Sequence, residues 1–122
     1  LANGGKGAIV FTSTFVGHGV GLPGMAAYAA AKSGLIGLTQ VLAAEHGPAA
    51  LRVNALLPGG TMTEMAPSDA GALKWIAGLH ALKRIAEPDE IAAAAAFLLS
   101  DDASFITGTA LFADGGNSIC KT

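Results

Sequence analysis

Tyr28 and Lys32 lie four residues apart in the stretch AAYAAAKSG, which otherwise carries only small side chains. On a helix, residues four apart share one face and are separated by about 6 Å along the axis. There the charge of the lysine can favour ionisation of the phenol, which suits the tyrosine to donate or accept a proton near neutral pH. For this pair alone, a surface lysine beside a half-buried tyrosine is the competing interpretation.

Three short, mostly apolar runs predict the strands that would surround this pair. Residues 7–14 (GAIVFTST) and 51–57 (LRVNALL) are typical of buried parallel strands, and a third strand is predicted over 110–114 (ALFAD). Glycine or proline precedes or follows each run, and these residues commonly mark the turns between secondary-structure elements.

Helices are predicted between these strands, over residues 23–46, over 69–82 and from Pro88 onwards. The last of these opens with acidic residues in its first turn, which match the positive end of a helix. Gly34 and Gly37 lie inside the first helix, where glycine usually permits close approach of another backbone. We therefore expect this helix to pack tightly against a neighbouring element.

The alternation of strands and helices predicts right-handed crossovers and a parallel sheet. Ligands of such sheets bind at the carboxyl ends of the strands. Residues 12–14, 58–60 and 114–116 lie at those ends, and Tyr28 and Lys32 follow the first of them. The polar and flexible residues thus converge on one edge, which favours a functional site there.

Composition narrows the classes of function. The chain has 122 residues, of which 52% are hydrophobic, and this is enough for one small domain. Its net charge of -2 offers no basic surface, so nucleic acid is not an expected partner. No apolar run is long enough to cross a membrane, and the single cysteine excludes an internal disulfide. These features predict a cytoplasmic protein. The three histidines are far apart in the sequence and do not have the spacing of metal ligands, so no metal site is expected.

Four segments in order carry a family resemblance: IVFTSTFVG, PGMAAYAAAKSGLIGLT, LRVNALLPGGTMTEM and RIAEPDEIAAAAAFLLSDDASFITGTALFADGG. Their order and spacing are specific, and over essentially the whole chain they resemble the C-terminal half of the short-chain dehydrogenase/reductase family. The resemblance implies an α/β fold with a doubly wound parallel sheet (Rossmann-like). It also implies hydride transfer between a nicotinamide cofactor, NAD or NADP, and a small-molecule alcohol or carbonyl substrate.

The same resemblance assigns catalytic roles. Tyr28 takes the place of the family's general acid/base, and Lys32 takes that of the lysine that assists the tyrosine and binds the nicotinamide ribose, so both are also expected at the cofactor. A strand-end serine normally polarises the substrate oxygen, and counting from the strand places Thr14 at that position. Ser13 is the alternative, because the loop to Tyr28 is one residue longer than usual and adjacent strand residues face opposite sides.

Further cofactor contacts follow from the turn after the second strand. Pro58, Gly59 and Gly60 match the family's turn that lines the nicotinamide, while Thr61 and Thr63 match positions that contact its carboxamide and the phosphates. For the two threonines, ordinary turn and cap chemistry is the alternative.

A variable substrate lid matches residues 64–82. Trp75 lies within it, and the sequence leaves substrate contact and packing as open alternatives for this side chain.

The family's glycine-rich pyrophosphate turn is not found in these residues. We therefore expect residues 1–122 to be the C-terminal part of a single Rossmann-like domain, equivalent to strands five to seven of a seven-stranded sheet, and inactive in isolation. The alternative is a truncated, catalytically inactive fragment that associates with itself. In either case we expect a homo-oligomer, a dimer or tetramer, formed through helix 23–46, the free edge of strand 7–14, or strand 110–114.

Overall fold

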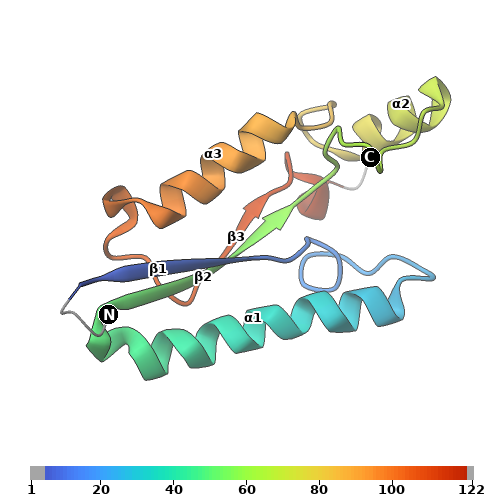
Figure 1. Ribbon diagram of the computed structural model, residues 1–122. Helices are drawn as coiled ribbons and strands as arrows, with labels where there is room; N and C mark the ends of the chain where they lie inside the picture. Colours follow the sequence, from blue (N-terminus) through green and yellow to red (C-terminus); the bar gives the residue numbers. More distant parts are fainter. Residues whose placement is uncertain (1–4, 121–122) are drawn as a thin grey trace.

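A parallel sheet of three strands organises the computed structural model, which describes residues 5–120 (Figure 1). The strands are β1 (Gly7–Thr12), β2 (Leu51–Pro58) and β3 (Ala110–Ala113), in the spatial order β1-β2-β3. Both pairings are parallel, with Gly7 opposite Leu51 at the start of the first one. The predicted parallel sheet is thus confirmed.

Helices lie on both faces of this sheet. α1 (Ala26–His46) runs along one face and α3 (Pro88–Leu99) along the other, whereas α2 (Ala70–Leu79) lies beyond the end of the sheet to which the β2 arrow points (Figure 1). Three 3₁₀ turns complete the chain: Gly47–Ala49, Asp101–Ala103 and Asn117–Ile119. A parallel sheet between helical layers is the predicted doubly wound α/β arrangement.

The core lies around β2, because this strand has a neighbour on each side and a helix over each face. Its residues 53–57 are all buried, and Ile36 of α1 packs against Ala55 and Leu57. Burying a side chain such as Leu57 stabilises the fold by about 1.5–3 kcal/mol.

β1 differs from the prediction of a buried strand, since none of its residues is fully buried. It pairs only with β2 within the described residues, so its other edge has no strand beside it.

Two polar side chains of β2 tie the sheet to the elements around it. The guanidinium of Arg52 donates to the carbonyls of Leu98 and Ser100, at 2.8 and 3.0 Å, and so satisfies acceptors at the end of α3. Asn54 is 1% exposed, and its side-chain oxygen accepts a hydrogen bond from the Thr109 backbone at 3.1 Å. Buried polar groups of this kind are stable because their hydrogen bonds are made.

The first helix begins later than predicted. Pro23 and Gly24 form a turn, closed by a 3.3 Å hydrogen bond from the Met25 N–H to the Leu22 carbonyl. Gly24 has a φ of +83°, which a right-handed helix does not allow, so α1 starts only at Ala26.

Other boundaries differ by a few residues. β1 ends at Thr12 and β3 at Ala113 rather than at 14 and 114, since the strand register with β2 ends at these residues. α2 ends at Leu79 rather than at 82, and Lys83 in the following turn has a φ of +56°. The start of α3 is confirmed, with Pro88 as its first residue.

Gly34 and Gly37 do not make the close contacts with another element that we expected of them. No atom of another element lies within 4 Å of the position that a Cβ would take at either glycine. The buried face of α1 is instead the opposite one, which carries Ile36, Thr39 and Ala43. The prediction is wrong within the described residues, and the face with the two glycines is exposed.

Candidate active site

Most of the predicted site residues lie where the carboxyl ends of the three strands meet. Ser13 and Thr14 directly follow β1, Gly59 and Gly60 follow β2, and Asp114 follows β3. The convergence predicted from the alternating elements is therefore present.

Lys32 reaches this edge from α1. Its Nζ donates a hydrogen bond of 3.2 Å to the carbonyl of Thr12, the last residue of β1. Tyr28 lies one helical turn earlier on the same helix, as predicted, and its side chain is 45% exposed. The ammonium is thus held at the strand end, with the phenol one turn away and accessible to a substrate.

The two candidate hydroxyls differ in what they bind. Ser13 and Thr14 are both buried, with 5% and 6% exposure. The hydroxyl of Ser13 donates to the Lys32 carbonyl at 2.6 Å, which fastens β1 to α1. The hydroxyl oxygen of Thr14 accepts from the Val16 N–H at 3.4 Å, which leaves the hydroxyl hydrogen of Thr14 able to donate elsewhere.

A close approach fixes the turn after β2. A Cβ at Gly59 would lie 2.8 Å from the Cα of Asp114, so only glycine fits against the chain that leaves β3. The Gly59 N–H donates to the Ala113 carbonyl at 3.1 Å, and the Gly60 N–H donates to Nε2 of His80 at 3.1 Å. Hydrogen bonds to two different segments of the chain thus hold the backbone of the two glycines.

The two threonines of this turn differ in their surroundings. The hydroxyl of Thr61 donates to the Gly59 carbonyl at 3.1 Å, which is ordinary turn chemistry. Thr63 is exposed, and its carbonyl accepts from the Ala66 N–H. Pro58 is the last residue of β2.

Asp114 organises the turn after β3. Its carboxylate accepts hydrogen bonds from the N–H groups of Gly116 and Ser118, at 3.0 and 2.9 Å. Burial raises the pKa of the Asp114 carboxyl, but the hydrogen bonds from Ser118 and Gly116 outweigh this effect and leave the pKa below its ordinary value. The carboxylate is therefore held ionised as the acceptor that shapes this turn.

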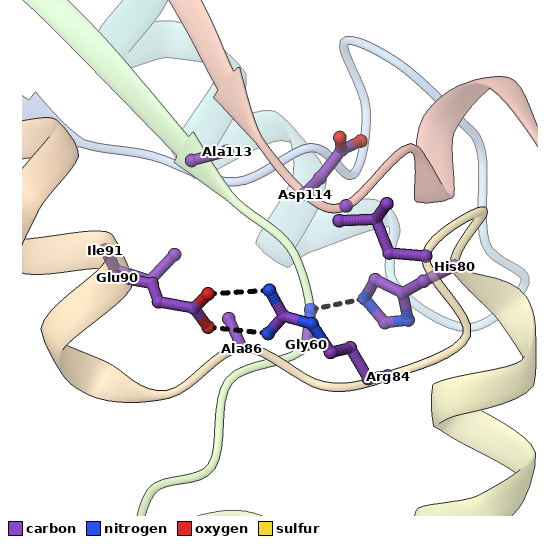
Figure 2. A pocket seen from close by; sticks show the side chains of 10 residues that line it. Gly60, His80, Arg84, Ala86, Glu90, Ile91, Ala113 and Asp114 are labelled. Carbon is purple, nitrogen blue, oxygen red and sulfur yellow. Dashed lines mark hydrogen bonds and ion pairs between the residues drawn. The ribbon is translucent and has the colours of Figure 1, made fainter.

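Sequence reasoning missed the role of His80. Its side chain is 1% exposed, and its ring points at the Gly60 N–H beside a cavity of about 160 Å³ (Figure 2). A lone histidine within the lid segment gave no signal for this contact, because Gly60 lies twenty residues away in the sequence.

Arg84 and Glu90 form an ion pair at the other side of the same cavity (Figure 2). Two parallel hydrogen bonds of 2.7 and 2.6 Å join them. The hydrogen bond from Arg84, with another from the Glu87 backbone, lowers the pKa of Glu90 to about 2. Glu90 also closes a capping box with Glu87 at the start of α3, so the pair fixes the chain that leads into this helix.

The helix α2 within the lid segment is only loosely packed. α2 has no buried residue, and the Trp75 side chain is 67% exposed. The packing alternative for Trp75 is therefore not supported, whereas its contact with substrate stays a prediction.

Within the described residues 5–120, no three His, Cys, Asp or Glu side chains gather in a group that could hold a metal ion. No helix in this part of the chain is both long and apolar enough to cross a membrane.

The fold agrees with what the comparisons with known proteins show. The chain is similar to 2,5-dichloro-2,5-cyclohexadiene-1,4-diol dehydrogenase of Sphingobium indicum, with 45% identity over 95% of this chain and 48% of the relative. It is also similar to 3-oxoacyl-(acyl-carrier-protein) reductase FabG of Chlamydia trachomatis, with 46% identity over 91% of this chain and 45% of the relative.

Among solved structures, the aldohexose dehydrogenase of Thermoplasma acidophilum superposes with a TM-score of 0.85 at 35% identity, over 93% of this chain and 49% of that one. The chain thus belongs to the short-chain dehydrogenase/reductase family. Within that family, the model described as enoyl-(acyl carrier protein) reductase matches residues 1–118. The chain spans about half the length of the curated relatives it matches.

Proposed function

We propose that this chain carries the catalytic groups of an NAD- or NADP-dependent oxidoreductase that interconverts an alcohol and a carbonyl. The observation that carries the proposal is the 3.2 Å hydrogen bond from Lys32 Nζ to the Thr12 carbonyl. It holds the helix of Tyr28 and Lys32 against the strand end that bears Ser13 and Thr14. A proton-transferring phenol, a cation and a hydroxyl donor thereby share one edge, as carbonyl reduction requires.

In this reaction Tyr28 moves the proton. In the direction of reduction its phenol donates a proton to the carbonyl oxygen, and in oxidation the phenolate accepts the proton of the alcohol. Lys32 stabilises the phenolate electrostatically and binds the ribose hydroxyls of the cofactor. Proton transfer of this kind is worth roughly 10²- to 10⁴-fold in rate.

We assign the substrate-polarising hydroxyl to Thr14. Ser13 already donates its hydrogen to the Lys32 carbonyl, so it has no second one for a substrate. Thr14 uses only its oxygen, as the acceptor for the Val16 N–H. Thr14→Val should therefore lower kcat more than Ser13→Ala in the full-length protein, and the reverse order would transfer the role to Ser13.

The residues of the turn after β2 fit a nicotinamide cofactor. A Cβ at Gly59 would clash with Asp114, and one at Gly60 would crowd His80 and Ile76, so the turn tolerates no larger residue at these positions. Neither position therefore carries a side chain that could block the approach of a flat ring. We propose that Pro58, Gly59 and Gly60 line the nicotinamide and that Thr61 and Thr63 bind its carboxamide and the phosphates. Bound at this edge, the cofactor would supply or accept the hydride.

We also propose that the protein forms a two-fold symmetric homo-oligomer through α1. The exposed face of α1 is apolar or small over most of its length: Ala27, Ala30, Gly34, Leu38 and Val41. Exposed apolar faces of this extent associate in water, and small residues let two helices approach closely. The alternative contacts are the strand β3 and the edge of β1 that pairs with no strand among the described residues.

Turnover of reduced cofactor by the full-length natural protein tests the proposed function. NADH and NADPH are each supplied with a panel of small ketones and aldehydes, and the loss of nicotinamide absorbance is followed. We expect turnover with one of the two cofactors. A folded protein that turns over neither cofactor, in either direction and across the panel, would contradict the proposal and favour a non-catalytic, self-associating role.

A further inference from the structure

Two backbone groups determine which nitrogen of the His80 ring carries the hydrogen. Its Nδ1 lies 2.9 Å from the Ile76 carbonyl oxygen, and its Nε2 lies 3.1 Å from the Gly60 nitrogen. A carbonyl can only accept and an N–H can only donate, so the ring must carry its hydrogen on Nδ1 and offer a lone pair at Nε2. His80 is thus held as a neutral imidazole of defined tautomer.

The ring also fills the space between three segments of the chain. A Cβ at Gly60 would lie 2.9 Å from His80 Cε1, and one at Gly115 would lie 3.3 Å from His80 Cδ2. The side-chain amide of Asn117 lies 3.5 Å from Nε2. The end of α2, the turn after β2 and the turn after β3 therefore all meet on one imidazole, whose ring faces Gly60 in Figure 2.

We propose that His80 is a positioning residue that holds the Gly59–Gly60 turn in the geometry required for the nicotinamide and links this turn to α2. The inference rests on the proposed function, because the proposed function places the nicotinamide cofactor at this turn. His80 does not touch the reacting atoms, but it supplies the acceptor for the Gly60 N–H. It is also joined by its own backbone to the lid segment, so a displacement of α2 would move the acceptor away from the turn.

Two substitutions separate this role from simple packing. His80→Gln keeps a side-chain oxygen that can reach the Gly60 N–H, whereas His80→Leu fills the space without an acceptor. We expect His80→Leu to raise the KM for the cofactor about tenfold, the equivalent of one lost hydrogen bond, with a smaller effect on kcat. His80→Gln should restore most of the affinity. His46→Leu, an exposed change at the far end of α1, serves as the control.

The measurements are cofactor KM with NADH and NADPH and amide hydrogen exchange of the segment around Gly60, both in the full-length protein. In His80→Leu we expect faster amide exchange at Gly60 and a raised cofactor KM, and in His80→Gln we expect near-normal values of both. In the unmutated protein, the nitrogen NMR shifts of the His80 imidazole should place the hydrogen on Nδ1. Unchanged exchange and unchanged KM in His80→Leu would overturn this inference alone. An unmutated protein that binds neither cofactor would overturn the proposed function, and this inference with it.

Discussion

Substitution of Gly59 by alanine should destabilise the protein, because the turn after β2 lies directly against the chain that leaves β3. The new methyl group would lie 2.8 Å from the Cα, 2.9 Å from the carbonyl oxygen and 3.0 Å from the Cβ of Asp114. Ordinary contacts begin near 3.4 Å, and two of these three atoms belong to the backbone, so the turn itself must move. Overpacking of this kind costs about 1–3 kcal/mol.

Urea unfolding measures this loss. With a denaturant dependence of about 1–3 kcal/mol per molar urea, a loss of about 2 kcal/mol lowers the midpoint by roughly 1 M. Gly78→Ala is the matched control: this glycine is in α2 with no atom within 4 Å of a new Cβ. Alanine is the better helix former there by about 1 kcal/mol, so its midpoint should rise. Equal shifts in the same direction for both variants would refute the close approach at Gly59.

Three further predictions concern stability and assembly. Because the pKa of Glu90 is lowered in the fold from 4.5 to about 2, its stabilising contribution is present above about pH 4.5 and lost as the pH falls toward 2. Thermal midpoints of Glu90→Gln and the natural sequence should therefore converge over that range, and a constant difference would contradict the ion pair with Arg84. Arg52→Met should cost about 1–3 kcal/mol in urea unfolding, because the carbonyls that end α3 lose their donor, whereas an unchanged midpoint would show that water replaces it. Val41→Glu on the exposed face of α1 should shift sedimentation toward monomers, and a natural protein that is already a stable monomer would contradict assembly through α1.

The sequence predicted the elements well wherever a local pattern determines them. The three strands, the three helices and their parallel order follow from apolar runs and from helix-start signals such as Pro88. Tyr28 and Lys32 were identified on one helix because a spacing of four residues has a direct geometric meaning. The strand-end position of Ser13 and Thr14 followed from the same reasoning.

The remaining features depend on the conformation of single turn residues or on contacts between elements, which the sequence pattern does not determine. The start of α1 was misplaced because the left-handed φ of Gly24 could not be known from Pro-Gly alone. Gly34 and Gly37 were expected to contact a neighbour, but the burial of a helix face depends on which side meets the sheet. His80 was missed for the same reason, since its partners are the backbone groups of Ile76 and Gly60.

Turnover by Tyr28→Phe in the full-length protein tests the central claim most directly. The substitution keeps the ring and removes the proton that Tyr28 is proposed to transfer. With NADH or NADPH and the carbonyl panel, kcat should fall by about 10²- to 10⁴-fold, while the affinity for the reduced cofactor changes little. Near-normal turnover by this variant would contradict the assignment of Tyr28 as the acid/base and with it the proposed mechanism.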